Sequence, residues 1–431
     1  MPRPDATRRS GTGAAVAGMT MVTIGAMVAN VASYLLHLPA GRWLGPAGYG
    51  EFASLLAAQL VVAVPALALQ TVVAREVVHG RGTAPMRRLG YRCAAAAAAV
   101  ALIAVPLVAW ALDTSVAGAF GSLVTAPLLV LLAAEQGLLQ GRGRFAHLSV
   151  VLAAAGVAKV VPAVAVLAAG GGPGAALFAG ALGTGAVAFA ASVLVGRSGG
   201  ASAGTAPTSV RAGHVPGAGA VLRASQVQLA LIALTSIDLM LARMQLDADS
   251  AGLYALGAVA TKIAFWLPQA VGVVLYPQMA NPAKSAGAVR SALTVLVALG
   301  GALVAAAAVC APLVPVLFGD AYRPVQSLLW LFALQGACLA VLQGALLSAI
   351  AGNRTRLAAV AWLGLVVEAT LMVAYATTVE QFVAVAVATA ASTAAVAAVL
   401  ALRAARAGDP GTGAEGAGGA DENAAPHPDP R

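Results

Sequence analysis

The chain has 431 residues, of which 60% are hydrophobic and 10% are charged, and its mean hydropathy is +0.87. A soluble globular domain is about half apolar and about one quarter charged, so this composition excludes a soluble protein and indicates a membrane protein. The net charge of +9 comes from arginines dispersed over short segments without interleaved aromatic residues, which argues against nucleic-acid binding.

Apolar runs long enough to cross a bilayer recur along the whole chain. A hydrocarbon core of about 30 Å needs about 20 residues per helix, and the sequence therefore predicts an all-α polytopic membrane protein with twelve transmembrane helices. The predicted spans are residues 18–38, 51–74, 90–112, 116–138, 147–169, 175–196, 222–244, 251–276, 288–311, 326–350, 357–379 and 382–402.

The distribution of basic residues predicts the orientation. With the N-terminus inside, and residues at the ends of spans counted with the adjoining loops, twenty Lys and Arg residues fall on the cytoplasmic side and three on the outer side, and two, Lys159 and Lys262, lie deep within spans. This bias favours a multi-pass protein of the cell membrane with both termini cytoplasmic. The first apolar run is too long for the h-region of a signal peptide, so we predict that it is retained as a helix.

A short motif occurs twice, about 200 residues apart. An offset of 204 residues places "AGYG" (47–50) on "AGLY" (251–254), and brings Pro65 within one residue of Pro268. Both prolines fall inside predicted spans, where they interrupt the helical hydrogen bonds and predict kinks. Because each half holds six spans, we expect two parallel six-helix lobes related by an axis along the membrane normal.

The expected domain organisation follows from this repeat. A cytoplasmic tail (1–17) precedes the N-lobe (18–196), a Gly/Ala/Ser-rich cytoplasmic linker (197–221) leads to the C-lobe (222–402), and the low-complexity tail (403–431) is expected to be disordered. Three widely separated cysteines give neither a disulfide framework nor metal-ligand spacing, and we expect no metal site and no cofactor.

Three segments carry a family resemblance. "LGPAGYGEFASL" (44–55), "AGLYALGAVATKIAFWLPQAVGVVLYPQMA" (251–280) and "LFGDAYRPVQSLLWLFALQGACLAVLQGALLSAIAGNRTRL" (317–357) resemble polysaccharide-biosynthesis flippases of the multidrug/oligosaccharidyl-lipid/polysaccharide exporter superfamily. The resemblance implies two six-helix lobes around a central cavity lined largely by helices 1, 2, 7 and 8. It also implies alternating access for a polyprenyl-pyrophosphate-linked saccharide, and other polysaccharide-assembly proteins as partners. The first span lacks the cavity arginines of lipid II flippases, which favours a different saccharide.

Two intramembrane charges are the leading candidates for the substrate site. Lys262, near the middle of the eighth span, is expected either to meet the pyrophosphate or to pair with Asp238 and hold helices 7 and 8 together. A lysine at the bilayer centre costs about 3 kcal/mol and therefore needs a cavity or a partner. Asp238 could alternatively bind Na⁺ or a proton as a coupling site.

Other polar residues in or near the spans are assigned structural roles or substrate contacts. Lys159 and Glu368 lie in equivalent helices of the two halves and are expected to be structural charges satisfied within their lobes, and Glu135 is expected to reach the interface or Arg142. Further candidates for substrate contact are three residues in or just after the first span: Asn30, His37 and Arg42.

The same residues bear on three competing functions. A cation-coupled drug or metabolite antiporter of the same superfamily is the main alternative, although spans 1 and 2 contain no internal acid. A membrane glycosyltransferase or polymerase needs acidic residues on a roomy outer loop, which the short outer loops do not offer, so we do not expect an enzyme. A scaffold of polysaccharide assembly without transport activity stays open.

Overall fold

The computed structural model describes residues 5–197, 228–266, 285–351 and 358–406. The predicted linker beyond Arg197, the predicted kink at Pro268 and the chain beyond Arg406 lie outside these residues. The described residues form helices and contain no strand, and eight of their segments are long and apolar enough to cross a membrane. The prediction of an all-α polytopic membrane protein is confirmed.

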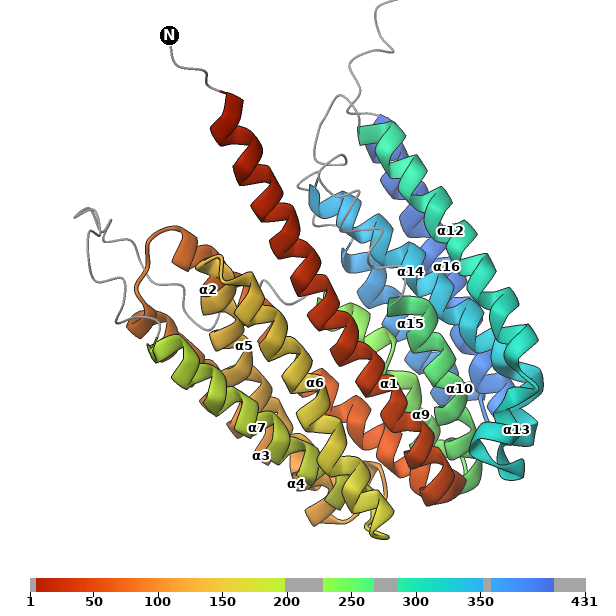
Figure 1. Ribbon diagram of the computed structural model, residues 1–431. Coiled ribbons are helices and arrows are strands. Elements are labelled where there is room, and N and C mark those ends of the chain that lie inside the picture. Colours follow the sequence, from red (N-terminus) through yellow and green to blue (C-terminus); the bar gives the residue numbers. More distant parts are fainter. Residues whose placement is uncertain (1–4, 198–227, 267–284, 352–357, 407–431) are drawn as a thin grey trace, which may run out of the picture.

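The first half of the chain forms one group of helices, which we call the N-lobe (Figure 1). Its elements are α1 (Asp5–Ala63), α2 (Pro65–Val78), α3 (Thr83–Ala111), α4 (Val116–Leu123), α5 (Thr125–Gly141), α6 (Phe145–Ala168) and α7 (Pro173–Arg197).

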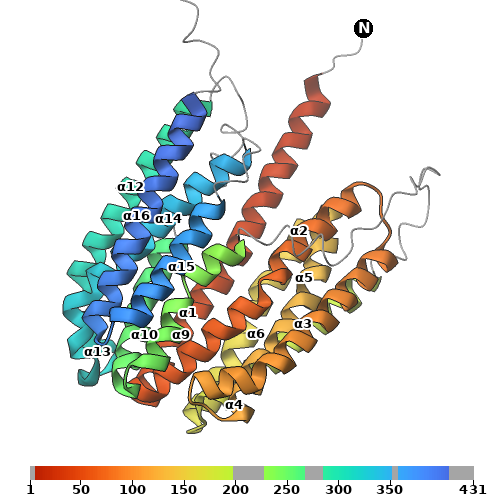
Figure 2. The same ribbon diagram turned by 180° about the vertical axis from the view of Figure 1, so that it is seen from behind.

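The second half forms the C-lobe, on the other side of α1 (Figure 2). Its elements are residues 228–234, α9 (Ile237–Gln245), α10 (Ala248–Trp266), α12 (Ser285–Cys310), α13 (Leu313–Phe318), the 3₁₀ helix η3 (Asp320–Leu328), α14 (Leu329–Ala351), α15 (Ala358–Tyr375) and α16 (Val379–Arg406). We call the end of the molecule where α1 begins the basic end, because most of the arginines lie there, and the opposite end the far end.

The segment after the first span is a sharp bend rather than the loop that its glycines suggest. Helical residues continue through it, and only Gly45 leaves the helical conformation, with φ 65° and ψ 178°. A left-handed φ is easy for glycine alone, and Pro46 follows it at the start of the next helical stretch, where proline is tolerated. Helix α1 therefore contains the first predicted span and most of the second. The predicted break at Pro65 is present too, since α1 ends at Ala63 and α2 begins at Pro65.

Glycines set the closest helix contacts of the N-lobe. A Cβ at Gly156 would lie 2.4 Å from the Cα of Ala29, and a Cβ at Gly183 would lie 1.7 Å from the carbonyl oxygen of Ala158. These positions bring α6 against α1 and α7, because a backbone without a side chain can approach its neighbour. In a chain so rich in Gly and Ala, the sequence alone does not distinguish these glycines from the others.

The repeated motif lies where the two lobes meet at the far end. A Cβ at Gly252 would lie 1.9 Å from the carbonyl oxygen of Pro46, and one at Gly50 would lie 2.9 Å from the backbone nitrogen of Gly252.

A charged residue stands just before this contact. Asp247 precedes α10 and its carboxylate accepts a hydrogen bond from the backbone N–H of Ser250 at 3.0 Å. The hydroxyl and the backbone N–H of Ser250 keep the pKa of Asp247 below its ordinary value, so the carboxylate stays charged at the helix start.

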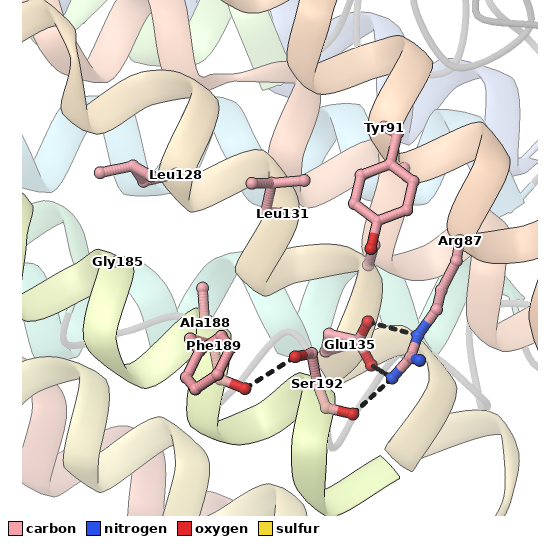
Figure 3. A pocket seen from close by; sticks show the side chains of 11 residues that line it. Arg87, Tyr91, Leu128, Leu131, Glu135, Gly185, Ala188, Phe189 and Ser192 are labelled. Atoms are coloured by element: carbon pink, nitrogen blue, oxygen red, sulfur yellow. Dashed lines mark hydrogen bonds and ion pairs between the residues drawn. The ribbon is translucent and has the colours of Figure 1, made fainter. Parts of the chain in front are cut away.

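An ion pair between a partly buried arginine and a buried glutamate joins three helices of the N-lobe near the basic end (Figure 3). Arg87 of α3 donates from Nε and Nη2 to the two carboxylate oxygens of Glu135 in α5, at 2.8 and 3.0 Å, and from Nη2 to the carbonyl of Ser192 in α7 at 2.6 Å. Glu135 thus pairs with Arg87, a partner that was not predicted, and it has no ion pair with Arg142 among the described residues, although its charge acts on Arg142.

Arg87→Met is expected to lower the free energy of unfolding by about 3–5 kcal/mol, because it leaves Glu135 buried without a partner. Adding Glu135→Leu should restore most of the loss, since an apolar pair can replace a buried ion pair. Thermal unfolding in detergent measures both changes. Arg88→Met, at an exposed neighbouring position, is the control and should change stability by less than about 0.5 kcal/mol. Equal effects of the Arg87 and Arg88 substitutions would contradict the assignment.

Candidate interlobe and C-lobe sites

Two lysines from opposite lobes lie near the interlobe surface. Lys159 is the fifteenth residue of α6 and Lys262 the fifteenth of α10, so both lie well inside their helices. Both side chains are half-buried. The charge of Lys262 acts on Lys159, and both charges act on the ring of His37, so the three groups face a common region. Within its own lobe Lys159 packs on α7, where its Cγ lies 3.3 Å from the position of a Cβ at Gly180, and the prediction that it is a structural charge of the lobe stays a prediction.

No carboxylate compensates these two lysines within contact distance. In the described part of the chain neither Lys159 nor Lys262 has an ion pair within 4.0 Å. The alternative prediction, a direct pair between Lys262 and Asp238, is therefore not observed, although the charge of Asp238 does act on Lys262. Two like charges inside a membrane protein are costly without a counter-ion, so this arrangement favours an anion between them.

The surroundings of the lysines are aromatic and polar. Tyr34 of α1 donates its hydroxyl to the backbone carbonyl of Lys262 at 3.3 Å, which fixes α1 against α10 beside the lysine. His37, one turn further along α1, is buried and shares a hydrogen bond of 2.8 Å between Nδ1 and the hydroxyl of Tyr49. Edge-to-face contacts join this histidine to Tyr49 and Phe52.

The other predicted residues of the first helix lie apart from this cluster. Asn30, two turns before His37, is exposed. Arg42 is exposed at the far end and donates to the carbonyl of Leu317 at 3.3 Å. Arg42 therefore contributes to the interlobe contact at that end, whereas Asn30 lies toward the basic end.

A second polar site lies inside the C-lobe around Asp238, which is buried in the first turn of α9. One carboxylate oxygen accepts from the hydroxyl of Tyr254 at 2.9 Å and from Nε2 of Gln335 at 3.3 Å, and the other accepts from the backbone N–H of Leu239 at 2.8 Å. Thr261 extends the network by donating to Oε1 of Gln335 at 3.1 Å. Asp238 is thus held by α9, α10 and α14 together.

The helix that carries Asp238 is broken just before it. Residues 228–234 are helical, Thr235 and Ser236 form a turn, and α9 begins at Ile237. The hydroxyl of Ser236 is buried without a hydrogen-bond partner in the described residues. Interrupted membrane helices occur where the freed groups line a polar site, and the position of Asp238 fits this pattern.

Glu368 brings a second acid to the same region. It lies on α15, is 1% exposed, and its Oε1 has no hydrogen-bond partner in the part of the chain that the structure describes. Its charge acts on Tyr254, and the charge of Asp238 acts on it, so the two acids are neighbours. Glu368 was predicted to be satisfied within its lobe, but one of its oxygens is not. An under-satisfied buried carboxyl next to another one is suited to hold a proton or a cation.

Sequence reasoning missed three residues of these sites: Tyr34, Tyr254 and Gln335. Tyr254 lies inside the repeated motif, which is the one signal that pointed to it. Tyr34 and Gln335 are ordinary members of apolar spans, and only the packing of α1 on α10 and of α14 on α10 shows their role.

Hydrogen bonds between the lobes occur from the far end to the depth of Lys262. Five are present in the described residues: Tyr34 to Lys262, Arg42 to Leu317, Ser54 to Leu239, Arg243 to Leu112 and Tyr322 to Gly41. Toward the basic end the two groups of helices diverge (Figures 1 and 2). The described parts of the two lobes are therefore joined at the far end and apart at the basic end.

Comparisons with known proteins agree with this arrangement. No protein-family model matches the chain, and no curated protein matches it significantly. Among solved structures, it is similar to an inward-facing multidrug resistance MATE family transporter of the MOP superfamily (TM-score 0.67, 12% identity, 92% of this chain and 99% of that one). It is also similar to the lipid II flippase MurJ in an inward closed conformation (TM-score 0.66, 10% identity, 90% and 86%).

An outward-facing MATE family transporter is less similar (TM-score 0.55, 13% identity, 91% and 96% covered). The chain therefore has the fold of MOP-superfamily transporters, in an arrangement closed at the far end.

Proposed function

We propose that this protein is a transporter that moves an anionic, lipid-linked saccharide across the cell membrane by alternating access. The observation that carries the proposal is the pair of half-buried lysines, Lys159 of the N-lobe and Lys262 of the C-lobe, which lie near enough to repel each other and have no ion pair within 4.0 Å among the described residues. A polyprenyl pyrophosphate supplies the anion that these charges require, while its tail stays in lipid. The fold, shared with a lipid flippase and with multidrug transporters, supports transport.

The direction of the proposed transport follows from the position of the arginines. If the basic end is cytoplasmic, as the positive-inside rule predicts, the lobes are open toward the side on which lipid-linked saccharides are assembled. The pyrophosphate then binds between Lys159 and Lys262, and closure at the basic end with separation at the far end releases it in the outer leaflet.

We further propose that the C-lobe acids couple this movement to a cation gradient. Asp238 and Glu368 are buried neighbours beside a broken helix, and α10 carries both Tyr254, which holds Asp238, and Lys262. A proton or Na⁺ bound by the acids would change the charge next to the same helix that contacts the substrate. The same acids favour the second candidate function, a cation-coupled antiporter of small molecules.

Reconstitution into liposomes with a fluorescent polyprenyl-pyrophosphate saccharide tests the function. Wild type is expected to translocate the lipid, and Lys159→Gln and Lys262→Gln are each expected to slow it by more than about ten-fold, the effect of losing roughly 1.4 kcal/mol of binding. Arg290→Gln, at an exposed position of the basic end, is the charge-matched control. Undiminished translocation by both lysine variants would refute the site. A wild type that moves no lipid but exchanges organic cations for protons or Na⁺ would favour the antiporter.

A further inference from the structure

A short segment of the C-lobe lies against the bend of α1 at the far end. It consists of α13 and η3, which connect α12 to α14, and we call it the clamp (Figure 1). Gly319 joins its two helices with φ 110°, a value that residues with a side chain rarely adopt. The nine residues of η3 form a long 3₁₀ helix that leads directly into α14, and such stretches often mark a functional hinge. The clamp therefore differs in construction from the spans on either side of it.

Three contacts join the clamp to the first arm of α1, the residues before the bend. The hydroxyl of Tyr322 donates to the carbonyl of Gly41 at 3.1 Å. The ring of Phe318 covers the same glycine so closely that a Cβ at Gly41 would lie 2.7 Å from Cδ1 of Phe318. Arg42 donates to the carbonyl of Leu317 at 3.3 Å. The clamp thus holds the N-lobe at the residues that directly precede the bend.

Tyr322 also contacts the second arm of α1, the residues after the bend. Its ring lies edge-to-face against the ring of Tyr49, with centroids 6.3 Å apart and an interplanar angle of 85°. Tyr322 is 1% exposed, whereas its neighbours Ala321 and Arg323 are exposed, and Tyr49 is fully buried. One buried side chain of the C-lobe therefore contacts both arms, the first through its hydroxyl and the second through its ring.

His37 and Tyr49 fix the angle between the two arms. They lie on opposite arms, and the hydrogen bond of 2.8 Å between Nδ1 and the hydroxyl spans the bend. The bend itself depends on the one non-helical residue, Gly45, so a bond between the arms is needed to keep a single angle. The charges of both interlobe lysines act on the same histidine. His37 therefore determines where Tyr49 meets Tyr322, and it lies between that contact and the lysines.

We propose that the clamp is the gate of the far end, with Tyr322 as the gating residue and His37 as a positioning residue that acts through Tyr49. While His37 holds Tyr49, Tyr322 contacts both arms and the far end stays closed. When the bond across the bend is lost, the arms move apart, Tyr322 loses its ring contact and the lobes separate at this end. The proposal rests on the proposed alternating access but not on the identity of the transported molecule.

Distances between spin labels at Trp43→Cys and Ser327→Cys test the gating residue in the purified full chain without substrate. Both positions are exposed, one on α1 and one on η3, and the native cysteines are replaced by alanine. Tyr322→Phe removes only the hydroxyl and should raise the ratio of long to short distances about five-fold, the effect of one net hydrogen bond. Tyr322→Ala removes the ring as well and should raise the ratio further. Tyr375→Phe, which removes the hydroxyl of an exposed tyrosine, is the control and should resemble wild type.

A pair of substitutions tests the positioning residue with the same labels. His37→Leu removes the partner of Tyr49 and should also raise the ratio about five-fold, whereas His37→Asn carries an amide near the place of Nδ1 and should restore most of the wild-type distribution. In the Tyr322→Ala background His37→Leu should add nothing, because Tyr49 then has no ring to meet. His147→Leu, at an exposed position of the basic end, is the control.

The outcomes separate the gate from the positioning role. Unchanged distances in both Tyr322 variants would overturn the gate. Equal opening by His37→Leu and His37→Asn, or a full additional effect of His37→Leu in the Tyr322→Ala background, would overturn the role of His37. Because the distances are measured without substrate, a failure to translocate lipid bears on the proposed function and leaves this test in place.

Discussion

Gly252→Leu is expected to force the lobes apart at the far end and to shift the protein toward an outward-open arrangement. The new Cβ would lie 1.9 Å from the carbonyl oxygen of Pro46 and 2.3 Å from its carbon, and backbone atoms cannot yield as a flexible side chain does. Overpacking of this kind costs about 1–3 kcal/mol. A cost confined to the far-end-closed state changes the ratio of the two states by about 5- to 150-fold.

Distances between spin labels at Trp43→Cys and Asp249→Cys measure this shift. Both positions are exposed at the far end, one in each lobe, and the three native cysteines are replaced by alanine. Wild type should give mainly short distances and Gly252→Leu mainly long ones. Gly301→Leu, which adds the same side chain to an open helix surface, should resemble wild type. An unchanged distance distribution in Gly252→Leu would mean that the glycine contact does not close the far end.

Glu368→Gln is expected to uncouple transport from its driving gradient while leaving the fold intact. The side chain is 1% exposed with one oxygen unpartnered, so glutamine fits the same space and cannot take up or release a proton. Transport driven by a proton or Na⁺ gradient should fall by at least about ten-fold, and the unfolding temperature should change little, because an isosteric neutral group removes no packing.

Gradient-driven and gradient-free uptake into proteoliposomes separate the two effects. Glu380→Gln, an exposed acid at the start of α16, is the matched control and should keep the full response. If Glu368→Gln responds to the imposed gradient as strongly as wild type, the C-lobe acids are structural and the coupling site lies elsewhere.

Much of the fold could be predicted from the sequence because bilayer thickness sets the length of apolar runs. Even the two predicted spans that are separated by only three residues, 90–112 and 116–138, correspond to separate helices, because α3 ends at Ala111 and α4 begins at Val116. The bend at Gly45 could not be distinguished from a loop in the sequence, because glycine and proline mark both loops and sharp kinks between helices.

The sites were harder to predict because membrane helices of similar composition give no sign of which face meets which neighbour. Lys262 and Asp238 stood out as charges in apolar runs, but their partners depend on packing. Arg87 and Glu135 are 48 residues apart, and neither the spacing nor the composition indicated that they pair.

The five hydrogen bonds between the lobes share one property. In each, a side chain of one lobe donates to a backbone carbonyl of the other, so the acceptor is present whichever residue occupies that position. Substitutions at the acceptor positions therefore leave the bonds in place, and the contact between the lobes can tolerate extensive sequence divergence. When the lobes separate, each of these hydrogen bonds is replaced by one to water, at a net free-energy cost of only about 1 kcal/mol per bond. The contact between the lobes is therefore also readily reversible.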